Sequence, residues 1–117
     1  MAFKFEKLRI WQQSIELSEK INKICRQFPK DEIFVLVSQM KRAADSVSLN
    51  IAEGSTGQSK SEFRKFLGYA IRSSVEVVGC LYLARSRAYI SEGVFQELYI
   101  FLDSLVKSIQ ALRNSLN

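Results

Sequence analysis

The sequence has 117 residues, of which 47% are hydrophobic and 25% charged, and it contains one proline, five glycines and two cysteines. This length and apolar content predict one folded domain, residues 1–117, and exclude a disordered chain. The 17 basic and 12 acidic residues give a net charge of +5, which favours a polyanionic partner but also serves solubility. The sequence has no histidine, so the commonest general base and metal ligand is missing.

The first predicted helix covers residues 7–27 and carries one apolar stripe. The stripe consists of Ile10, Leu17, Ile21, Ile24 and Phe28. Because proline disfavours helical geometry in the residue before it, Phe28-Pro29 should end this helix. Trp11 is expected to be a core or interface anchor.

The second predicted helix covers residues 31–53 and stops at Gly54. Its apolar residues alternate steps of four and three, which is typical of one face of a packed helix. They are Ile33, Val37, Met40, Ala44, Val47 and Ile51. Residues 54–58 include two glycines and small polar side chains, which predicts a loop. Ser59 and Glu62 then fit a capping box at the start of the next helix.

The third predicted helix covers residues 60–87, and the fourth begins after Ser91, a suitable N-cap. The third stripe consists of Phe63, Leu67, Ala70, Ser74, Val77, Leu81, Ala84 and Ala88, and the fourth of Leu98, Leu102, Leu105, Ile109, Leu112 and Leu116. Gly68 and Gly79 share a second row of the third helix, where glycine costs about 1 kcal/mol relative to alanine. They indicate either close approach of another helix, which a second subunit could supply, or glycines tolerated in a long helix.

The pattern as a whole predicts an all-α fold, an antiparallel up-down-up-down four-helix bundle. No stretch alternates apolar and polar residues for long enough to predict a sheet. We find no stretch long and apolar enough to span a bilayer and no secretory signal, so we expect a cytoplasmic protein without a membrane partner. Cys25 and Cys80 lie in helical patterns without ligand spacing and are expected to be buried thiols. No metal or cofactor is predicted.

A resemblance to a known family rests on residues spread over nearly the whole chain. They are Phe5, Leu8, Ile10, Trp11 and Gln12; Phe28, Pro29 and Glu32; Gln39, Arg42, Ala43, Ala44 and Ser46; Asn50-Ile51-Ala52-Glu53-Gly54; and Glu62, Phe63, Phe66 and Leu67. The chain resembles the four-helix bundle proteins encoded in intervening sequences of bacterial 23S ribosomal RNA genes, also labelled S23 ribosomal proteins. The resemblance implies a four-helix bundle that assembles as a homopentamer.

The sequence also departs from the pattern of that family. Val35, Ser48, Gln58 and Arg72 stand where the family usually has glycine, proline, a basic residue and glycine. The changes at Gln58 and Arg72 affect surface chemistry. A related family of the same fold, the accessory proteins of diversity-generating retroelements, binds a reverse transcriptase and nucleic acid, but the block from Asn50 to Gly54 favours the first family.

Basic residues on the second and third predicted helices are the candidate nucleic-acid-binding residues. They are Lys41, Arg42, Lys60, Arg64, Lys65 and Arg72. In a hairpin that turns near residue 56, Arg42 falls opposite about residue 70, so Arg42 and Arg72 could form one patch. Arginine suits phosphate because its guanidinium is a planar fork of donors. The alternative is that Arg42 pairs internally with Asp45 or Glu76.

Polar residues at the predicted turn could instead have a structural role. Glu53 and Glu62 flank the turn as a carboxylate pair might, but no nucleophile or metal partner accompanies them, so we predict no enzyme. The simpler interpretation is that Asn50, Glu53 and Glu62 join the two helices next to Gly54.

Two functional hypotheses follow. One is an oligomeric RNA-binding protein with a basic surface, and the other is an oligomeric scaffold for a protein such as a retroelement reverse transcriptase. Tyr69 and Tyr82 are the candidates for base stacking on the third helix, and they support stacking only weakly.

Overall fold

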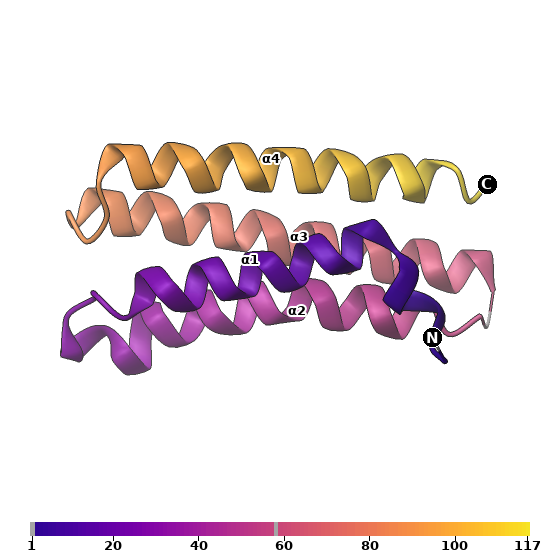
Figure 1. Cartoon of the computed structure of the whole chain (residues 1–117), viewed down its shortest axis with the longest axis horizontal. Helices are drawn as coiled ribbons and strands as arrows, with labels where there is room; N and C mark the ends of the chain where they lie inside the picture. Colours follow the sequence, from indigo (N-terminus) through magenta and orange to yellow (C-terminus); the bar gives the residue numbers. More distant parts are fainter. Residues whose placement is uncertain (1, 58) are drawn as a thin grey trace.

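The computed structural model describes residues 2–57 and 59–117, which form helices and turns with no strand. Four long helices follow one another, each antiparallel to the one before it (Figure 1): α1 (Arg9–Cys25), α2 (Ser38–Gly54), α3 (Lys60–Ser86) and α4 (Glu92–Asn114). The bundle measures 43 × 22 × 22 Å. The predicted all-α class and the up-down-up-down four-helix bundle are confirmed.

The bundle has two distinct ends (Figure 1). The α2–α3 end contains the start of α1, the connection from α2 to α3 and the end of α4, together with the short 3₁₀ helix η1 (Lys4–Lys7). The α3–α4 end contains the end of α1, residues 26–37 and the connection from α3 to α4. Contacts are most extensive between α2 and α3 and sparse between α1 and α4, so the seam between α1 and α4 is the most open.

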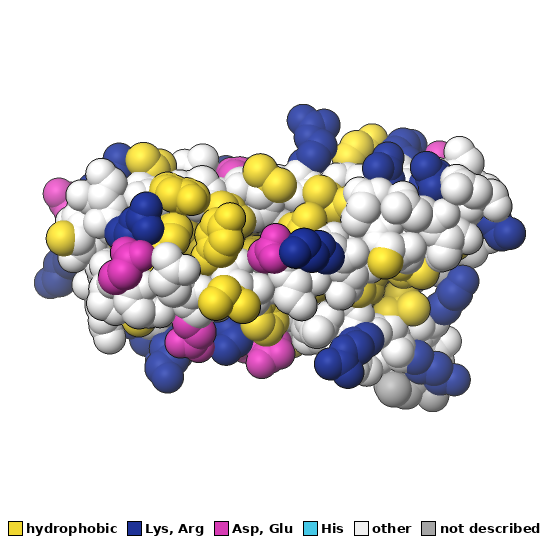
Figure 2. All heavy atoms as spheres, turned by 90° about the horizontal axis from the view of Figure 1, so that it is seen from above, with side chains coloured by type: hydrophobic (Ala, Val, Ile, Leu, Met, Phe, Trp, Pro, Cys, Tyr) yellow, Lys and Arg dark blue, Asp and Glu magenta, His cyan; other side chains and the backbone are white. Residues whose placement is uncertain are grey.

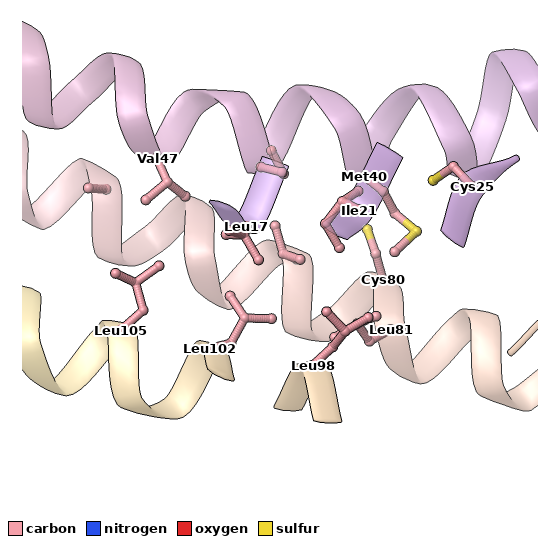
Figure 3. Packing of buried hydrophobic residues seen from close by; sticks show 14 of the residues in the cluster. Leu17, Ile21, Cys25, Met40, Val47, Cys80, Leu81, Leu98, Leu102 and Leu105 are labelled. Carbon is pink, nitrogen blue, oxygen red and sulfur yellow. The ribbon is translucent and has the colours of Figure 1, made fainter. Parts of the chain in front are cut away.

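Apolar side chains from all four helices meet along the bundle axis (Figure 3). Those labelled there are Leu17, Ile21, Cys25, Met40, Val47, Cys80, Leu81, Leu98, Leu102 and Leu105. Both cysteines are free and buried, as predicted. Burial raises the pKa of both thiols, that of Cys80 to about 11, because the thiolate loses its hydration in this core.

The predicted helix over residues 31–53 begins later than expected. Pro29 is followed by the 3₁₀ helix η2 (Lys30–Glu32), then by the π-helical turn η3 (Ile33–Val37), and only then by α2. The Glu32 side chain accepts a hydrogen bond from the Leu36 N–H at 3.4 Å and supports this wider turn. As a result Ile33, predicted to lie in the core, is 46% exposed, and Phe34 beside it is 90% exposed.

The remaining boundaries agree closely with the predicted ones. Helix α1 starts at Arg9 rather than 7 because Leu8 has an extended backbone, and it ends at Cys25. The Ser59 and Ser91 hydroxyls cap α3 and α4, accepting from the N–H groups of Glu62 and Val94 at 3.0 and 3.1 Å. Gln58, which we expected in the loop, lies outside the described residues.

The third predicted stripe is buried apart from its last residue. Ala88 is exposed and has a φ of 61°, because the chain turns there toward α4. The left-handed conformation is unfavourable for a residue with a Cβ, so the surrounding contacts must hold it. The adjacent Tyr89 supplies such contacts, packing its ring on Phe28 at 5.2 Å and donating its hydroxyl to Glu32 at 2.7 Å.

Helix α3 is long and apolar enough to cross a membrane by length and composition, contrary to our expectation from the sequence. Its most apolar 18-residue window has a mean hydropathy of 1.3, and 33% of that window is buried. In the bundle this helix packs against both α2 and α4. Its buried residues are Phe63, Leu67, Ala70, Ser74, Val77, Cys80, Leu81 and Ala84. Burial in the core thus covers a third of that window, and the rest of it is partly or fully exposed.

Candidate nucleic-acid interface

Positive charge is concentrated at the α2–α3 end. Its basic residues are Lys4, Lys7, Arg9, Lys60, Arg64, Lys65 and Arg113, and its acidic residues are Glu6, Glu53 and Glu62. Seven basic and three acidic residues give this end a charge of +4, most of the net +5 of the chain. On the face covered by α4, Figure 2 shows dark blue groups gathered toward this end and yellow groups toward the other.

The connection at this end depends on the absence of a side chain at Gly54. A Cβ built on Gly54 would lie 2.5 Å from the Phe66 Cβ and 3.1 Å from Phe63 Cδ1. Glycine is therefore required by the close approach of α3 and not by its φ angle. Gly57 has a φ of 86°, the left-handed region that favours glycine, and it turns the chain toward Ser59.

The polar residues predicted to join the two helices beside Gly54 do not do so. Asn50 donates to the Ser46 backbone carbonyl at 2.8 Å and to the Ser46 hydroxyl at 2.9 Å, within α2. Glu62 binds Lys65 at 3.2 Å instead of completing the capping box. Glu53 is exposed, and its carboxylate accepts no hydrogen bond from the other described residues. That prediction was wrong because Asn50 and Glu62 bond within their own helices, while at Gly54 the two helices approach without a side chain between them.

The guanidinium of Arg64 is used inside the protein. Its Nη1 donates to the backbone carbonyl of Arg113 at 2.6 Å, and Arg113 Nε donates to the carbonyl of Arg64 at 3.2 Å. These reciprocal bonds tie the start of α3 to the last turn of α4, where carbonyl groups lack helical partners. Arg64, predicted to bind nucleic acid, therefore acts first as a cap for α4.

The other predicted basic residues of α3 are more accessible. Lys60 and Arg72 are exposed and have no carboxylate within 4.0 Å among residues 2–57 and 59–117. Lys65 is half exposed, pairs with Glu62 and lies 5.6 Å from the Phe66 ring centroid. An exposed pair of this kind contributes little to stability, so Lys65 can exchange Glu62 for another anion.

The basic residues of α2 lie on another level of the bundle. The Ser73 hydroxyl donates to that of Ser46 at 3.0 Å. Because the helices are antiparallel, Arg42, four residues before Ser46, falls opposite Val77 rather than residue 70. Arg42 donates to the Ser38 hydroxyl at 3.1 Å and forms no ion pair with Asp45 or Glu76. Lys41 and Arg42 are both exposed, and in this register Arg42 lies about one and a half helical turns along the bundle from Arg72.

One basic residue of this surface was missed by the sequence analysis. Arg113 lines a hollow of about 370 Å³ between α3 and α4, together with Lys65, Gly68, Tyr69, Ile71, Arg72 and Gln110. Its guanidinium lies 3.6–3.7 Å from where a Gly68 Cβ would be. Gly68 therefore accommodates a side chain of its own subunit, whereas Gly79 has nothing within 4 Å of its Cβ position and remains open.

The described residues form no metal-binding cluster at this surface. No cluster of three or more His, Cys, Asp or Glu side chains among them is placed to hold a metal ion. Glu53 and Glu62 flank the turn, but Glu62 is already bound to Lys65. The arrangement can attract and hold anions, and its donors are lysine and arginine.

The fold and this surface define a small all-helical bundle protein with one basic end. The chain belongs to the family of 23S rRNA-intervening sequence proteins, whose model matches residues 6–111. The suspected family is confirmed. The family's description names no enzymatic activity.

Comparison with solved structures supports the same fold. The chain is similar to the crystal structure of a protein with unknown function from the S23 ribosomal protein family of Bacteroides thetaiotaomicron. The two are 21% identical with a TM-score of 0.82, and the match covers 89% of this chain and 97% of that chain. At this identity the likeness shows the fold alone. The comparison with curated proteins gives no match.

Proposed function

We propose that this protein binds RNA through the basic α2–α3 end of a homo-oligomer and has no catalytic activity. The observation that carries the proposal is the concentration of +4 at one end of a chain whose net charge is +5. The family is named for a 23S rRNA-intervening sequence, which makes RNA the polyanion to test first. Five subunits, the number that the resemblance implies, would repeat the basic end around one assembly and multiply its positive field.

Binding of this kind is largely electrostatic. Lysine and arginine displace counterions from the phosphate backbone, so the logarithm of the affinity falls linearly with the logarithm of the salt concentration. The residues proposed to bind the phosphates are Lys60 and Lys65 of this end, with Arg113 added by the structure. Arg72 joins them from the middle of α3, because it lines the same hollow as Lys65 and Arg113. Lys41 and Arg42 lie near the start of α2, away from the α2–α3 end, and Arg64 positions α4.

The test compares two triple variants with the same change in charge. One carries Lys60→Gln, Lys65→Gln and Arg72→Gln. The control carries Lys23→Gln, Arg26→Gln and Lys30→Gln, which are exposed residues at the α3–α4 end without ion pairs among the described residues. The readout is the affinity for a single-stranded and a duplex RNA over a series of salt concentrations.

The first triple variant should lower the salt slope by about 0.7 for each phosphate of a single strand that it no longer binds, or about 2 in all. The control should retain the slope of the wild-type protein. An equal decrease in both variants would show that only net charge matters. Failure of the wild-type protein to bind either RNA at low salt would refute the proposed function.

A second candidate function is a scaffold for a protein partner. The segment Ile33, Phe34 and Val35 is exposed by 46%, 90% and 60%, and it forms the π-helical turn before α2. Contiguous exposed apolar residues of this kind are typical of protein contacts. Under this alternative, partner binding would be insensitive to salt and would be abolished by Phe34→Glu, while RNA binding would be absent.

A further inference from the structure

The hollow between α3 and α4 lies on the basic surface and has a definite composition. Lys65, Tyr69 and Arg72 follow one face of α3, and Gln110 and Arg113 belong to the last two turns of α4. Its volume of about 370 Å³ lies within the range of about 300–1,000 Å³ that is usual for sites of small molecules. It combines cationic donors with the apolar surfaces of Ile71 and Tyr69.

Two arginines from different helices line this hollow, and like most basic residues in the described part of the chain they have no ion-pair partner. Lys20, Arg85, Arg87 and Lys107 each have a carboxylate within 4.0 Å. Arg72 and Arg113 have none within that distance in the described part of the chain, although they line the same hollow from two helices. Like charges held close together repel one another, and an anion between them would relieve that repulsion.

Arg113 is oriented before any ligand arrives. Its Nε donates to the Arg64 carbonyl, and its guanidinium lies over Gly68, where a side chain longer than a methyl group would take its place. These contacts engage Nε and leave both Nη groups without a hydrogen-bond partner among residues 2–57 and 59–117. A guanidinium held through its Nε can direct its two Nη groups at two oxygens of a phosphate group.

We propose that this hollow binds the phosphate group of a nucleotide unit, with Arg113 and Arg72 as its donors and Tyr69 beside the base. The proposal rests on the proposed function in so far as RNA supplies that phosphate. Lys65 adds a third positive charge, and Gln110 an amide donor. Tyr69 is 40% exposed, and its ring is held edge-on by Phe66 at 5.5 Å, which leaves an aromatic surface for stacking.

The experiment has two arms that separate the sources of the phosphate. In the first, uridine monophosphate or inorganic phosphate is titrated into the wild-type protein, and NMR follows the Nε–H signals of the arginine side chains. In the second, a single-stranded RNA is titrated into the wild-type protein, Arg113→Gln, Arg72→Gln and the control Lys107→Gln. Lys107 lies on α4, has a side chain that is 76% exposed and does not line the hollow.

In the first arm, the signals of Arg72 and Arg113 should shift saturably, and those of Arg26 and Arg42 should not. In the second, Arg113→Gln and Arg72→Gln should each weaken RNA binding about tenfold, as expected when a charge-assisted hydrogen bond is removed, whereas Lys107→Gln should change it less than twofold. Arg113→Gln removes a hydrogen bond between α3 and α4 and could therefore loosen α4. Arg72 makes no hydrogen bond to another described residue, so Arg72→Gln tests the hollow without that effect.

The results of the two arms together distinguish the proposed phosphate site in the hollow from the proposed RNA-binding function. Shifts with phosphate but no RNA binding would assign the hollow to free nucleotides and refute the proposed function alone. RNA binding that falls equally in Arg113→Gln, Arg72→Gln and Lys107→Gln, with no shift on adding phosphate, would refute the hollow and leave the proposed function standing. Shifts together with a selective weakening of RNA binding support both.

Discussion

Glu32 connects three separate parts of the chain through one carboxylate. Its Oε2 accepts from the Tyr89 hydroxyl at 2.7 Å and from Arg87 Nη1 at 3.1 Å, and its Oε1 accepts from the Leu36 N–H at 3.4 Å. The pKa of Glu32 is lowered chiefly by the hydrogen bond from Tyr89. The hydrogen bond from the Leu36 N–H and the positive charge of Arg87 lower this pKa further. The same bond raises the pKa of Tyr89 above 10.0. The α3–α4 end is therefore held by a contact that depends on pH.

This contact leads to a prediction about stability. A lowered pKa means that Glu32 stabilises the fold above its unfolded value near 4.5 and that this contribution disappears as the pH falls through the folded pKa. The raised pKa of Tyr89 means that its contribution is present below pH 10 and disappears as the pH rises through the folded pKa. Tyr89→Phe should thus be less stable than the wild-type protein at pH 7, with a smaller difference at pH 3.

Urea unfolding at the two pH values measures this difference. The matched control is Tyr99→Phe, because the Tyr99 ring packs on Phe95 at 5.9 Å and its hydroxyl bonds to no described residue. The interpretation of Glu32 would be wrong if Tyr89→Phe were destabilised as much at pH 3 as at pH 7.

At the scale of elements, the clamp between α3 and α4 shows a role that helical periodicity does not reveal. Arg64 and Arg113 are 49 residues apart in the sequence, and their bonds join a side chain of one helix to the backbone of the other. A pattern of apolar residues gives the face of each helix but not the axial register between two helices. The same limit explains why Arg42 was placed opposite the wrong part of α3.

The clamp predicts that Arg64→Ala loosens the last turn of α4. The carbonyl of Arg113 would keep only the hydrogen bond from the Leu116 N–H at 3.2 Å, and the variant should be destabilised by about 1 kcal/mol, the usual net contribution of a hydrogen bond. Hydrogen exchange should become faster in residues 110–116, with little change at the middle of α4. Lys65→Ala, one residue further along the same helix, should leave the exchange in α4 unchanged. Equal protection in both variants would contradict the clamp.

At the scale of the whole molecule, the fold could be predicted because each helix carries one continuous apolar stripe. Alternating steps of three and four placed nearly every core residue correctly, since burial on a helix follows its period. The exceptions are Ala88, where the chain turns toward α4, and Ile33, where the hydrogen bond from the Leu36 N–H to Glu32 widens the turn and moves the side chain out of the core. The candidate site was predicted in part: Lys60, Lys65 and Arg72 are accessible, but Arg113 comes from a helix whose place beside α3 only the structure shows.

The exposed apolar surfaces allow a prediction about assembly. Val75, Gly79 and Leu83 repeat every four residues along the exposed side of α3, where Val75 is 58% and Leu83 is 43% exposed. A different patch, from Ile33 to Val35, lies on the turn before α2. In a ring of identical subunits, one patch of each subunit contacts a different patch of its neighbour. The patch on α3 and the patch before α2 are two such surfaces, so a contact between them could form a closed ring. We therefore expect a mass of five times 13.4 kDa in solution, the number being that of the resemblance.

Light scattering on a size-exclusion column measures that mass. Leu83→Glu and Phe34→Glu should each lower it, because a carboxylate buried at an apolar contact lacks a partner. Ile100→Glu is the control: Ile100 is 65% exposed and belongs to α4, not to either patch. A monomer mass for the wild-type protein at micromolar concentration would refute the assembly. A mass lowered by Ile100→Glu alone would move the contact to α4.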